Sequence, residues 1–555
     1  MSLHDLQKTW DLIVIGGGIT GAGILREAAR MGLRVILLEQ KDFAWGTSSR
    51  SSKLVHGGLR YIKEGHLMMT KTAVEERDRL LAEAPGLVET LGFFLPVYEE
   101  QKPGKRILKV GLTIYDIMGH KRRHRFLGAA ELMEKLPHLN PIGLKGGFLY
   151  YDAQVDDSRL VLRLITESMT SGAEALNYTM VTEILRNTDG NVVGVKIEDT
   201  ETHDGRNLYA SAIINATGCW AEKLHPSPEP QRYLRPLRGS HLLFPASTLP
   251  ISEGLGFNHP VDNRYVFIVP WEGAVLVGST DVDHDEGLTL EPTATQPELD
   301  YLMQGVHAIL PSLNISLEDC IAVFAGVRPV LSGGNCSPSE ESREHAVWTD
   351  NGLITVTGGK LTTFRRLAWD ALKAAKPFLP PIKLPDKKDS IFTEVLIKPE
   401  NDHGLSVGIW KRLYGRYGKS ADELVQTARS EDLAVIPGTQ TLWAELPFVA
   451  QNEQIRHLDD LLLRRVRIGL LIPHGANMHF RRIRKICKNA LPWSRRRWKA
   501  EQSRYLEQWN HTYTLPTQRS EGIAAGKRKF FRNPDAVLRF IHHKILSLRR
   551  QRQTV

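Results

Sequence analysis

The sequence is short of cysteine, and its few thiols lie far apart. Only four Cys occur among 555 residues, and no two of them form a C-x-x-C pair. Zinc sites, iron–sulfur clusters and disulfide frameworks need thiols at close or regular spacing. We therefore expect no metal site, and we expect the cysteines to be reduced thiols, as in a cytoplasmic protein. The cysteines are Cys219, Cys320, Cys336 and Cys487.

Long apolar runs are also missing. The longest uncharged run near the N-terminus, residues 12–25, is rich in glycine and shorter than the roughly 20 residues that a membrane-spanning helix needs. The first ten residues, MSLHDLQKTW, lack the basic region of a signal peptide. Neither a spanning helix nor a signal peptide is predicted. A chain of 555 residues is long enough for two or three globular domains.

Acidic residues are scarce at one end of the chain. Residues 464–555 contain 23 Lys or Arg and only 4 Asp or Glu, a local net charge of +19, whereas the rest of the chain has a net charge of −10. A basic end is attracted to polyanionic surfaces, either membrane lipid or nucleic acid. Residues 516–555 also carry an apolar stripe at helical spacing, which is typical of a basic amphipathic helix in a membrane interface. The stripe consists of Leu538, Ile541, Ile545 and Leu548.

A glycine-rich turn near the N-terminus predicts a dinucleotide site. Gly16, Gly18 and Gly21 form a G-x-G-x-x-G pattern between a β-branched strand, residues 11–15, and a helix. Glycines allow the backbone to approach a pyrophosphate at the helix N-terminus. Glu39 closes the second strand, where its carboxylate can accept the ribose hydroxyls of an adenosine. FAD and NAD both fit this pattern.

Two later segments favour FAD over NAD. A second strand ends in the small-residue turn INATGCWA, which contains Ala216 and Gly218. The segment GGKLTT begins a helix, and its N-terminus suits the edge of an isoalloxazine where negative charge develops. The residues of this second turn that we expect at the cofactor are Gly359, Lys360, Leu361 and Thr362.

The remaining pattern indicates the coarse organisation of the chain. Helical periodicity is predicted from about residue 66 to 91, and residues 96–150 are interpreted as short strands and loops. Mainly antiparallel strands follow, and a strand, turn and helix occupy residues 352–372. A proline-rich linker at 377–390 leads to a mostly helical end. The predicted antiparallel strands are 235–245, 264–271 and 274–281.

Several motifs together carry a family resemblance. In order and spacing, the sequence resembles the FAD-dependent glycerol-3-phosphate dehydrogenase family, densely over about residues 8–375 and more loosely to about 515. The motifs are GTSSRSSKLVHGGLRYI, YDAQVDDSRLV, INATGCWA, GSHLLFP, FIVPW, GSTD, AGVRP and GGKLTT. The resemblance implies oxidation of sn-glycerol 3-phosphate to dihydroxyacetone phosphate, with hydride passing from C2 to N5 of FAD and electrons passing on to membrane quinone.

The resemblance also implies an architecture. An α/β, Rossmann-like FAD-binding domain is expected to hold an inserted, mainly antiparallel β substrate domain, with a helical domain after it. The expected parts of the FAD-binding domain are residues 8–95, 152–230 and 322–376, and those of the substrate domain are 96–151 and 231–321. The expected C-terminal helical domain is 391–515, and the basic tail is 516–555.

Candidate substrate contacts follow from the matched motifs. Arg60, Arg328 and Lys360 are cations that the family places near the flavin, where they would hold the dianionic phosphate. His56 and His241 are the candidates for the general base, because imidazole titrates near working pH. The sequence slightly favours His56.

The motifs also suggest residues that shape the site. Tyr61 lines the pocket or donates a hydrogen bond, and Thr362 offers a hydroxyl or amide to flavin or substrate. The serine-rich block places Thr47, Ser48 and Ser49 at the cofactor. No His or Cys stands in a flavin-linking motif, so FAD is expected to bind without a covalent bond.

Alternatives remain open at this point. An oxidase branch of the family hands electrons to oxygen, and nothing in the motifs excludes it. A basic FAD protein that binds RNA fits the charge, but the basic segment has few aromatic residues for base stacking, so a nucleic-acid partner is disfavoured. A flavoprotein acting on an amine leaves the matched motifs unexplained. We expect a peripheral protein on the inner face of the cytoplasmic membrane, and the sequence leaves a monomer or a homodimer open.

Overall fold

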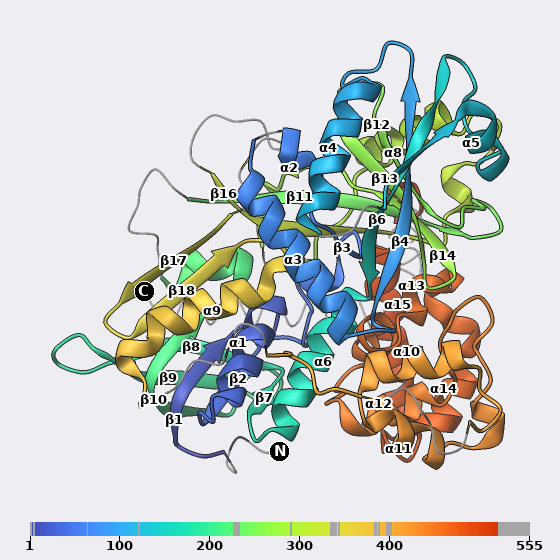
Figure 1. The fold of residues 1–555 in the computed structure, drawn as a ribbon. Coiled ribbons are helices and arrows are strands. Elements are labelled where there is room, and N and C mark those ends of the chain that lie inside the picture. The colour runs from blue at the N-terminus through green and yellow to red at the C-terminus, as the bar shows by residue number, and fades with distance from the viewer. Residues whose placement is uncertain are drawn as a thin grey trace, which may run out of the picture.

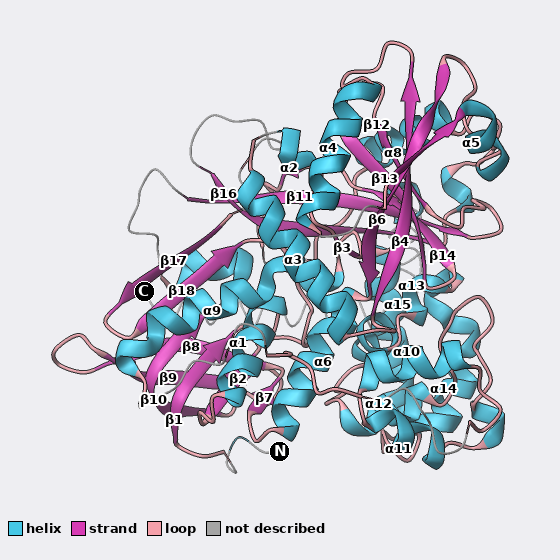
Figure 2. Cartoon of the chain, in the orientation of Figure 1, coloured by secondary structure: helices cyan, strands magenta, loops and turns pink. Residues whose placement is uncertain are grey.

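The chain forms two β-sheets with helices against them and a separate group of C-terminal helices (Figure 1, Figure 2). Among the described residues, no helix has the length and apolar character needed to cross a membrane. Only the backbone is described for Arg60, Lys63 and Tyr233. The computed structural model describes residues 3, 6–63, 65–119, 123–225, 233–288, 291–332, 341, 344–381, 386, 389–395 and 402–519.

The first sheet is mainly parallel. Its strand order is β17-β18-β10-β1-β2-β7, and β8 and β9 extend it beside β10. Leu12 and Val14 of β1 enter one core, whereas Ile13 and Ile15 enter another. Burial on both faces explains the unbroken apolar run from Leu12 to Ile15. The strands are β1 (Thr9–Ile15), β2 (Val35–Leu38), β7 (Glu174–Leu176), β8 (Thr179–Arg186), β9 (Val192–Asp199), β10 (Gly205–Asn215), β17 (His345–Asp350) and β18 (Leu353–Gly358).

Three helices cover one face of this sheet. The helix α1 (Ile19–Arg30) packs against α6 (Asp157–Thr170) and α9 (Phe364–Ala375). A Cβ atom at Gly23 of α1 would lie 2.7 Å from the ring of Phe364, so a glycine is needed for this close approach. The packing fixes the N-terminal end of α1 next to the strand ends that will form the site.

The second sheet is mainly antiparallel. Its order is β15-β11-β14-β13-β12-β4-β6-β3, with β16 paired to β11 and β5 paired to β6. The strands are β3 (Leu54–Val55), β4 (Val88–Tyr98), β5 (Arg125–Gly128), β6 (Leu144–Val155), β11 (Tyr233–Pro245), β12 (Gly254–Asn258), β13 (Tyr265–Trp271), β14 (Ala274–Gly278), β15 (Val282–Asp283) and β16 (Ala322–Ser332). The associated helices are α2 (Arg60–Lys63), α3 (Leu67–Glu83), α4 (Lys105–Met118), α5 (Ala129–Lys135) and α8 (Gln296–Ile309).

The C-terminal helices form the orange region at the lower right of Figure 1. Buried ion pairs fasten this region to the rest of the chain. Arg416 lies 3.0 Å from Asp156, and Arg159 lies 2.7 Å from Glu453. The helices are α10 (Val407–Tyr417), α11 (Ser420–Thr427), α12 (Glu445–Asn452), α13 (Ile468–Leu471), α14 (Phe480–Cys487) and α15 (Arg495–Thr512).

One helix differs from the sequence interpretation. Residues 96–150 were expected to hold short strands and loops, but α4 lies within them. Its Leu112 and Tyr115 are buried, whereas Ile107 and Ile117 are exposed. Apolar residues on both sides of a helix blur the single stripe that predicts one.

The expected helix over residues 66–91 is shorter than predicted. It ends at Glu83, because residues 88–98 form β4. The expected domain boundary between residues 95 and 96 falls within that strand. The segment 322–332 lies in the second sheet, where β16 pairs with β11.

Candidate active site

A cavity of about 1080 Å³ extends between the two sheets. It is larger than the roughly 300–1,000 Å³ of an ordinary small-molecule pocket, so it can hold a dinucleotide and a small substrate together. The predicted site residues that line it are Gly16, Gly18, Glu39, Thr47, Ser48, His56, Tyr61, Ala216, Gly218, Arg328, Gly359, Lys360, Leu361 and Thr362. Gly21, Ser49 and His241 are buried outside this lining.

The glycine turn stands at one end of the cavity. Gly16 has a φ of +108°, and a Cβ atom there would lie 2.6 Å from the carbonyl oxygen of Ala216. A Cβ atom at Gly21 would lie 1.9 Å from the carbonyl oxygen of Gly16. Both positions therefore require glycine for steric reasons. Gly18 is the N-cap of α1 and has no side chain with which to cap the helix. The N-terminus of α1 is directed toward the cavity, which Gly18 and Ile19 line.

Glu39 is fixed at the end of β2. Its carboxylate accepts hydrogen bonds from the backbone N–H groups of Gly17, at 2.7 Å, and Lys41, at 2.8 Å. Burial raises the pKa of Glu39, and these two hydrogen bonds oppose the shift. The geometry places an acceptor where the ribose of an adenosine would bind.

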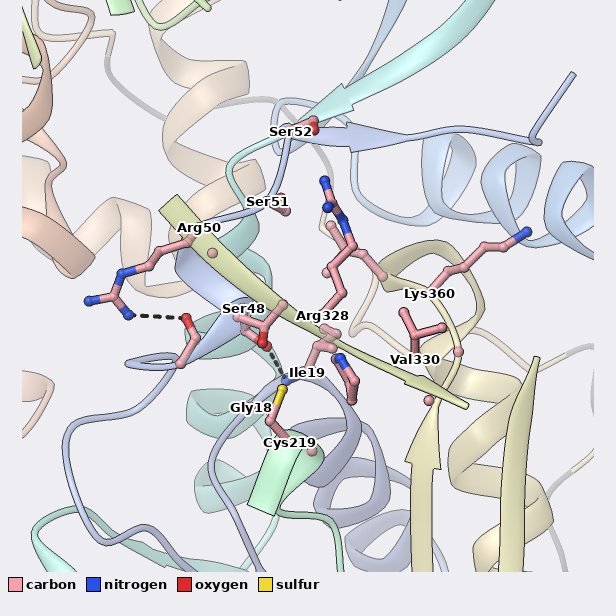
Figure 3. Close-up of a pocket in the computed structure, with 18 of the residues that line it drawn as sticks. Gly18, Ile19, Ser48, Arg50, Ser51, Ser52, Cys219, Arg328, Val330 and Lys360 are labelled. Carbon is pink, nitrogen blue, oxygen red and sulfur yellow. Dashed lines mark hydrogen bonds between the residues drawn. The ribbon is translucent and has the colours of Figure 1, made fainter. Parts of the chain in front are cut away.

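The serine-rich segment crosses in front of α1. Ser48 Oγ accepts a hydrogen bond from the backbone N–H of Ile19 at 2.9 Å, as Figure 3 shows. A hydroxyl therefore occupies the helix N-terminus, beside the position where a pyrophosphate would contact these amides. The Thr47 hydroxyl donates a hydrogen bond to the carbonyl of Val327. Ser49 faces away, and its carbonyl accepts a hydrogen bond from Lys53 Nζ at 2.7 Å.

Two turns form the other end of the cavity. The residues after β10 and after β18 meet there, and Thr357 Oγ1 donates to the carbonyl of Gly218 at 2.9 Å. Thr362 Oγ1 donates to the carbonyl of His56 at 3.2 Å, which ties the second turn to the serine-rich segment. Burial raises the pKa of the neighbouring Cys219 to about 12, so its sulfur stays a thiol. These features fit a flavin held without a covalent bond.

Two predicted cations enter the cavity near this end. Figure 3 shows Arg328 and Lys360 above β16, with Gly18 below it. Arg328 donates to Asp281 at 3.0 Å and to Ser279 Oγ at 2.6 Å, which fixes its guanidinium. Lys360 Nζ lies 3.5 Å from the centre of the Tyr61 ring.

Space for the guanidinium of Arg328 comes from a glycine on the paired strand. A Cβ atom at Gly239 of β11 would lie 2.4 Å from the guanidinium nitrogens of Arg328. The third predicted cation, Arg60, begins α2, and its side chain lies outside the described part of the structure.

The two predicted histidines take different positions. His56 is half-buried and lines the cavity. His241 is buried behind Ser52, whose Oγ lies 2.9 Å from His241 Nε2, and its ring stacks on Phe324. Burial holds the pKa of His241 well below 6.5, and the positive charges of Arg328 and Lys53 lower it further. His241 is therefore a neutral imidazole at physiological pH.

Arg264 was missed by the sequence analysis. It lines the same cavity, and its Nη2 lies 3.2 Å from the carbonyl of Ser279 and 3.9 Å from Asp281 Oδ2. Arg264 and Arg328 thus converge on one short segment. The only signal in the sequence was its place at the start of RYVFIVPW, a segment interpreted as a plain strand.

Comparisons with known proteins agree with this arrangement. A sequence model of the FAD-dependent oxidoreductase family matches residues 11–365, and a model of the C-terminal domain of alpha-glycerophosphate oxidase matches residues 386–498. The aerobic glycerol-3-phosphate dehydrogenase of Staphylococcus haemolyticus (strain JCSC1435) is 33% identical over 487 residues, which cover 83% of this chain and 87% of that protein. The protein of that name from Bacillus subtilis (strain 168) is 40% identical over 368 residues, or 65% of this chain and 66% of that protein.

Solved structures show the same fold. The glycerol-3-phosphate dehydrogenase from Bacillus halodurans, complexed with FAD, superposes with a TM-score of 0.71 and 26% identity over 90% of this chain and 95% of that one. The L-alpha-glycerophosphate oxidase from Mycoplasma pneumoniae, with FAD bound, has a TM-score of 0.55 and 18% identity over 70% of this chain and 100% of that one. With its two-sheet architecture, its glycine turn and its match over most of the sequence, the chain belongs to the FAD-dependent glycerol-3-phosphate dehydrogenase family.

Proposed function

We propose that the chain oxidises sn-glycerol 3-phosphate to dihydroxyacetone phosphate and passes the electrons to a membrane quinone. The observation that carries this proposal is the pair of cations, Arg328 and Lys360, in the same cavity as the nucleotide turn. A phosphate dianion needs such groups, and an arginine fork binds two of its oxygens. The names of the relatives support this substrate.

The phosphate end of the substrate is assigned to three groups. Arg328 and Lys360 bind the phosphate oxygens. Arg264 adds a second arginine, which contacts the same segment as Arg328, residues 279–281. Asp281 and Ser279 orient Arg328, so the guanidinium is held in place before substrate arrives. Arg60 remains a proposed fourth contact from the sequence alone.

We assign the removal of the proton from the C2 hydroxyl to His56. When bound at the glycine turn, FAD would supply the oxidising group that takes hydride from C2. The imidazole of His56 lines the cavity and takes the hydroxyl proton as the C2 carbonyl forms. His241 is set behind Ser52, and it contributes by holding the Ser52 hydroxyl in position.

The membrane contact belongs to the same proposal. Quinones reside in the bilayer, so a protein that reduces them has to bind at its surface. Arg464, Arg465 and Arg467 are buried in ion pairs. The other Lys and Arg residues of 467–555 supply attraction to anionic lipid. The tail at 516–555, proposed as a basic amphipathic helix, lies outside the described residues from Ser520 onward. The protein is thus assigned to the inner face of the cytoplasmic membrane as a peripheral protein.

A substrate panel tests this function. Purified holoprotein is assayed by dye reduction with sn-glycerol 3-phosphate, with glycerol, and with glycine and proline. We expect turnover of glycerol 3-phosphate alone. Glycerol lacks the phosphate, and glycine and proline lack both the phosphate and the C2 hydroxyl. Turnover of an amine in place of glycerol 3-phosphate would overturn the proposal. Rapid oxygen consumption without dye or quinone would favour an oxidase instead.

A further inference from the structure

The peptide group between His56 and Gly57 is held on both sides. Its carbonyl oxygen, which belongs to His56, accepts a hydrogen bond from Thr362 Oγ1 at 3.2 Å. Its N–H, which belongs to Gly57, donates to Tyr115 Oη at 2.9 Å and to Asp152 Oδ1 at 3.1 Å. A peptide group is planar, so hydrogen bonds to both its polar atoms fix the orientation of that plane. The backbone next to the proposed base is therefore held in place.

Three buried side chains from three elements make the N–H side of this arrangement. Tyr115 of α4 directs its hydroxyl at the carboxylate of Asp152 on β6, and both carboxylate oxygens lie 2.9 Å from it. Arg77 of α3 donates to Asp152 Oδ1 at 3.0 Å and to Tyr115 Oη at 3.1 Å. Arg77, Tyr115 and Asp152 thus form a clamp on the Gly57 N–H. All three are buried, where such hydrogen bonds are stronger than in water.

Glycines allow the turn to enter the clamp. A Cβ atom at Gly57 would lie 2.4 Å from Tyr115 Oη, so a side chain there would displace the hydroxyl. Gly58 has a φ of +79°, and a Cβ atom there would lie 2.2 Å from the ring of Tyr61. Lys360 Nζ lies 3.5 Å from the centre of that ring. The clamped turn therefore joins the proposed base to a proposed phosphate cation.

The proton on Tyr115 sets the direction of the hydrogen bonds in the clamp. Burial and the neighbouring Asp152 carboxylate hold the pKa of Tyr115 well above 10, so the phenol keeps its proton. That proton is donated to Asp152, which leaves the oxygen of Tyr115 to accept from Gly57. Burial raises the pKa of Asp152, and the charge of Arg77 opposes the shift. A buried ion pair of this kind adds little stability over apolar packing, which favours a role in positioning.

We propose that Asp152 and Tyr115 are positioning residues for the reaction, which hold the imidazole of His56 at the substrate C2 hydroxyl through the His56–Gly57 peptide. Arg77 compensates the charge of Asp152. Asp152 also lines the cavity, but both its carboxylate oxygens accept hydrogen bonds inside the clamp, which disfavours a direct role in proton transfer. The inference rests on the proposed function, because it acts through the base assigned there.

Removal of one hydroxyl tests the clamp. Tyr115→Phe keeps the ring and deletes the acceptor for the Gly57 N–H. In dye reduction by the full-length holoprotein, normalised to bound FAD, kcat should fall about tenfold or more while KM for sn-glycerol 3-phosphate stays within about twofold. Tyr505→Phe is the matched control, because Tyr505 is also buried and donates its hydroxyl to the carbonyl of Gly475 at 3.0 Å. The control should keep wild-type kcat. A wild-type kcat in Tyr115→Phe would overturn the proposal.

A double-mutant cycle shows whether the clamp acts through the base. In a His56→Asn background, Tyr115→Phe should change kcat by less than about twofold, because no base is left to position. A loss as large as in the wild-type background would contradict the proposal. Asp152→Asn keeps an oxygen for the Gly57 N–H and should retain more kcat than Asp152→Ala. Equal kcat values in the two Asp152 variants would also overturn the positioning role.

Hydrogen exchange gives a readout that needs no turnover. Mass spectrometry of peptides spanning residues 54–59 follows the Gly57 amide, which should exchange about tenfold faster in Tyr115→Phe than in wild type or Tyr505→Phe. If wild type carries FAD but fails to oxidise glycerol 3-phosphate, the proposed function fails and the positioning role fails with it. If wild type is active and the Gly57 amide exchanges equally in all three proteins, the clamp alone is contradicted.

Discussion

His241 Nε2 lies 2.9 Å from Ser52 Oγ, and of these two residues only Ser52 lines the cavity. The two predicted histidines are therefore not equivalent. His56 lines the cavity itself, whereas Ser52 lies between His241 and the cavity. A residue in that position can orient a neighbour, whereas direct proton transfer requires hydrogen-bond reach of the reacting group.

Replacement of each histidine by asparagine should separate these roles. His56→Asn should lower kcat by about 10²- to 10⁴-fold with little change in KM, because a general base is lost. His241→Asn keeps a hydrogen-bonding group for Ser52 and should retain the acidic limb of the kcat/KM pH profile, since the pKa of His241 lies well below 6.5. Steady-state kinetics between pH 5 and 9 measure both effects. Loss of that limb in His241→Asn alone would reassign the base.

Arg328 should control the use of the substrate phosphate. Arg328→Ala removes a cation and leaves the carboxylate of Asp281 without its 3.0 Å partner. We expect kcat/KM for glycerol 3-phosphate to fall by about 2–4 kcal/mol in transition-state stabilisation. Arg366, which is 47% exposed on α9, provides the control, and Arg366→Ala should leave kcat/KM unchanged. Equal kinetics for both variants would place Arg328 in a structural role.

Gly18 should be required for flavin binding. A valine at this position puts a branched side chain into the cavity, where the pyrophosphate has to approach α1. Purified Gly18→Val protein should lose the bound flavin that wild type carries at one FAD per chain, as measured by absorbance after heat release. Gly128 is a matched control, because a Cβ atom there meets nothing within 4 Å. A full flavin content in Gly18→Val would contradict the assignment of the nucleotide end.

The ion pair of Asp156 with Arg416 should stabilise the attachment of the C-terminal helices. Nearby arginines lower the pKa of Asp156 from 3.8 to about 2, against the opposing effect of burial. A carboxylate with a depressed pKa contributes stability above pH 3.8, and that contribution is lost as pH falls to about 2. Asp156→Asn should thus reduce the free energy of unfolding at pH 7 by about 3 kcal/mol.

Urea unfolding across a pH series measures this effect. The difference between wild type and Asp156→Asn should shrink as pH falls below 3.8 toward 2. Asp350→Asn is the control, because its pair with Arg186 is exposed and should contribute less than about 1 kcal/mol. An equal loss in both variants would show that the buried pair has no special role.

The sequence predicted the parts of this protein that depend on short-range chemistry. Gly16 and Gly21 are needed where the backbone packs against itself, so local spacing was sufficient to find them. The burial of the His241 side chain was not predictable from the sequence, because it arises from the pairing of β11 with β14 and β16. Arg264 enters the cavity only through the position of β13 in the second sheet.

The helix α4 illustrates a second limit. Its exposed face carries apolar residues as well as its buried face, so a rule that assigns apolar residues to the interior could not identify it. Arg328 shows the opposite case. Its motif predicted a cation at the substrate, and the structure adds the Asp281 and Ser279 contacts that hold its guanidinium.

The most direct test of the central claim is anaerobic mixing of the holoprotein with sn-glycerol 3-phosphate. The yellow absorption band of the oxidised flavin should bleach on addition of this substrate and persist with an equal concentration of glycerol. Substrate oxidation would then be linked to the cofactor without any external acceptor. An unchanged band with glycerol 3-phosphate, in protein that carries a full complement of FAD, would contradict the proposed activity.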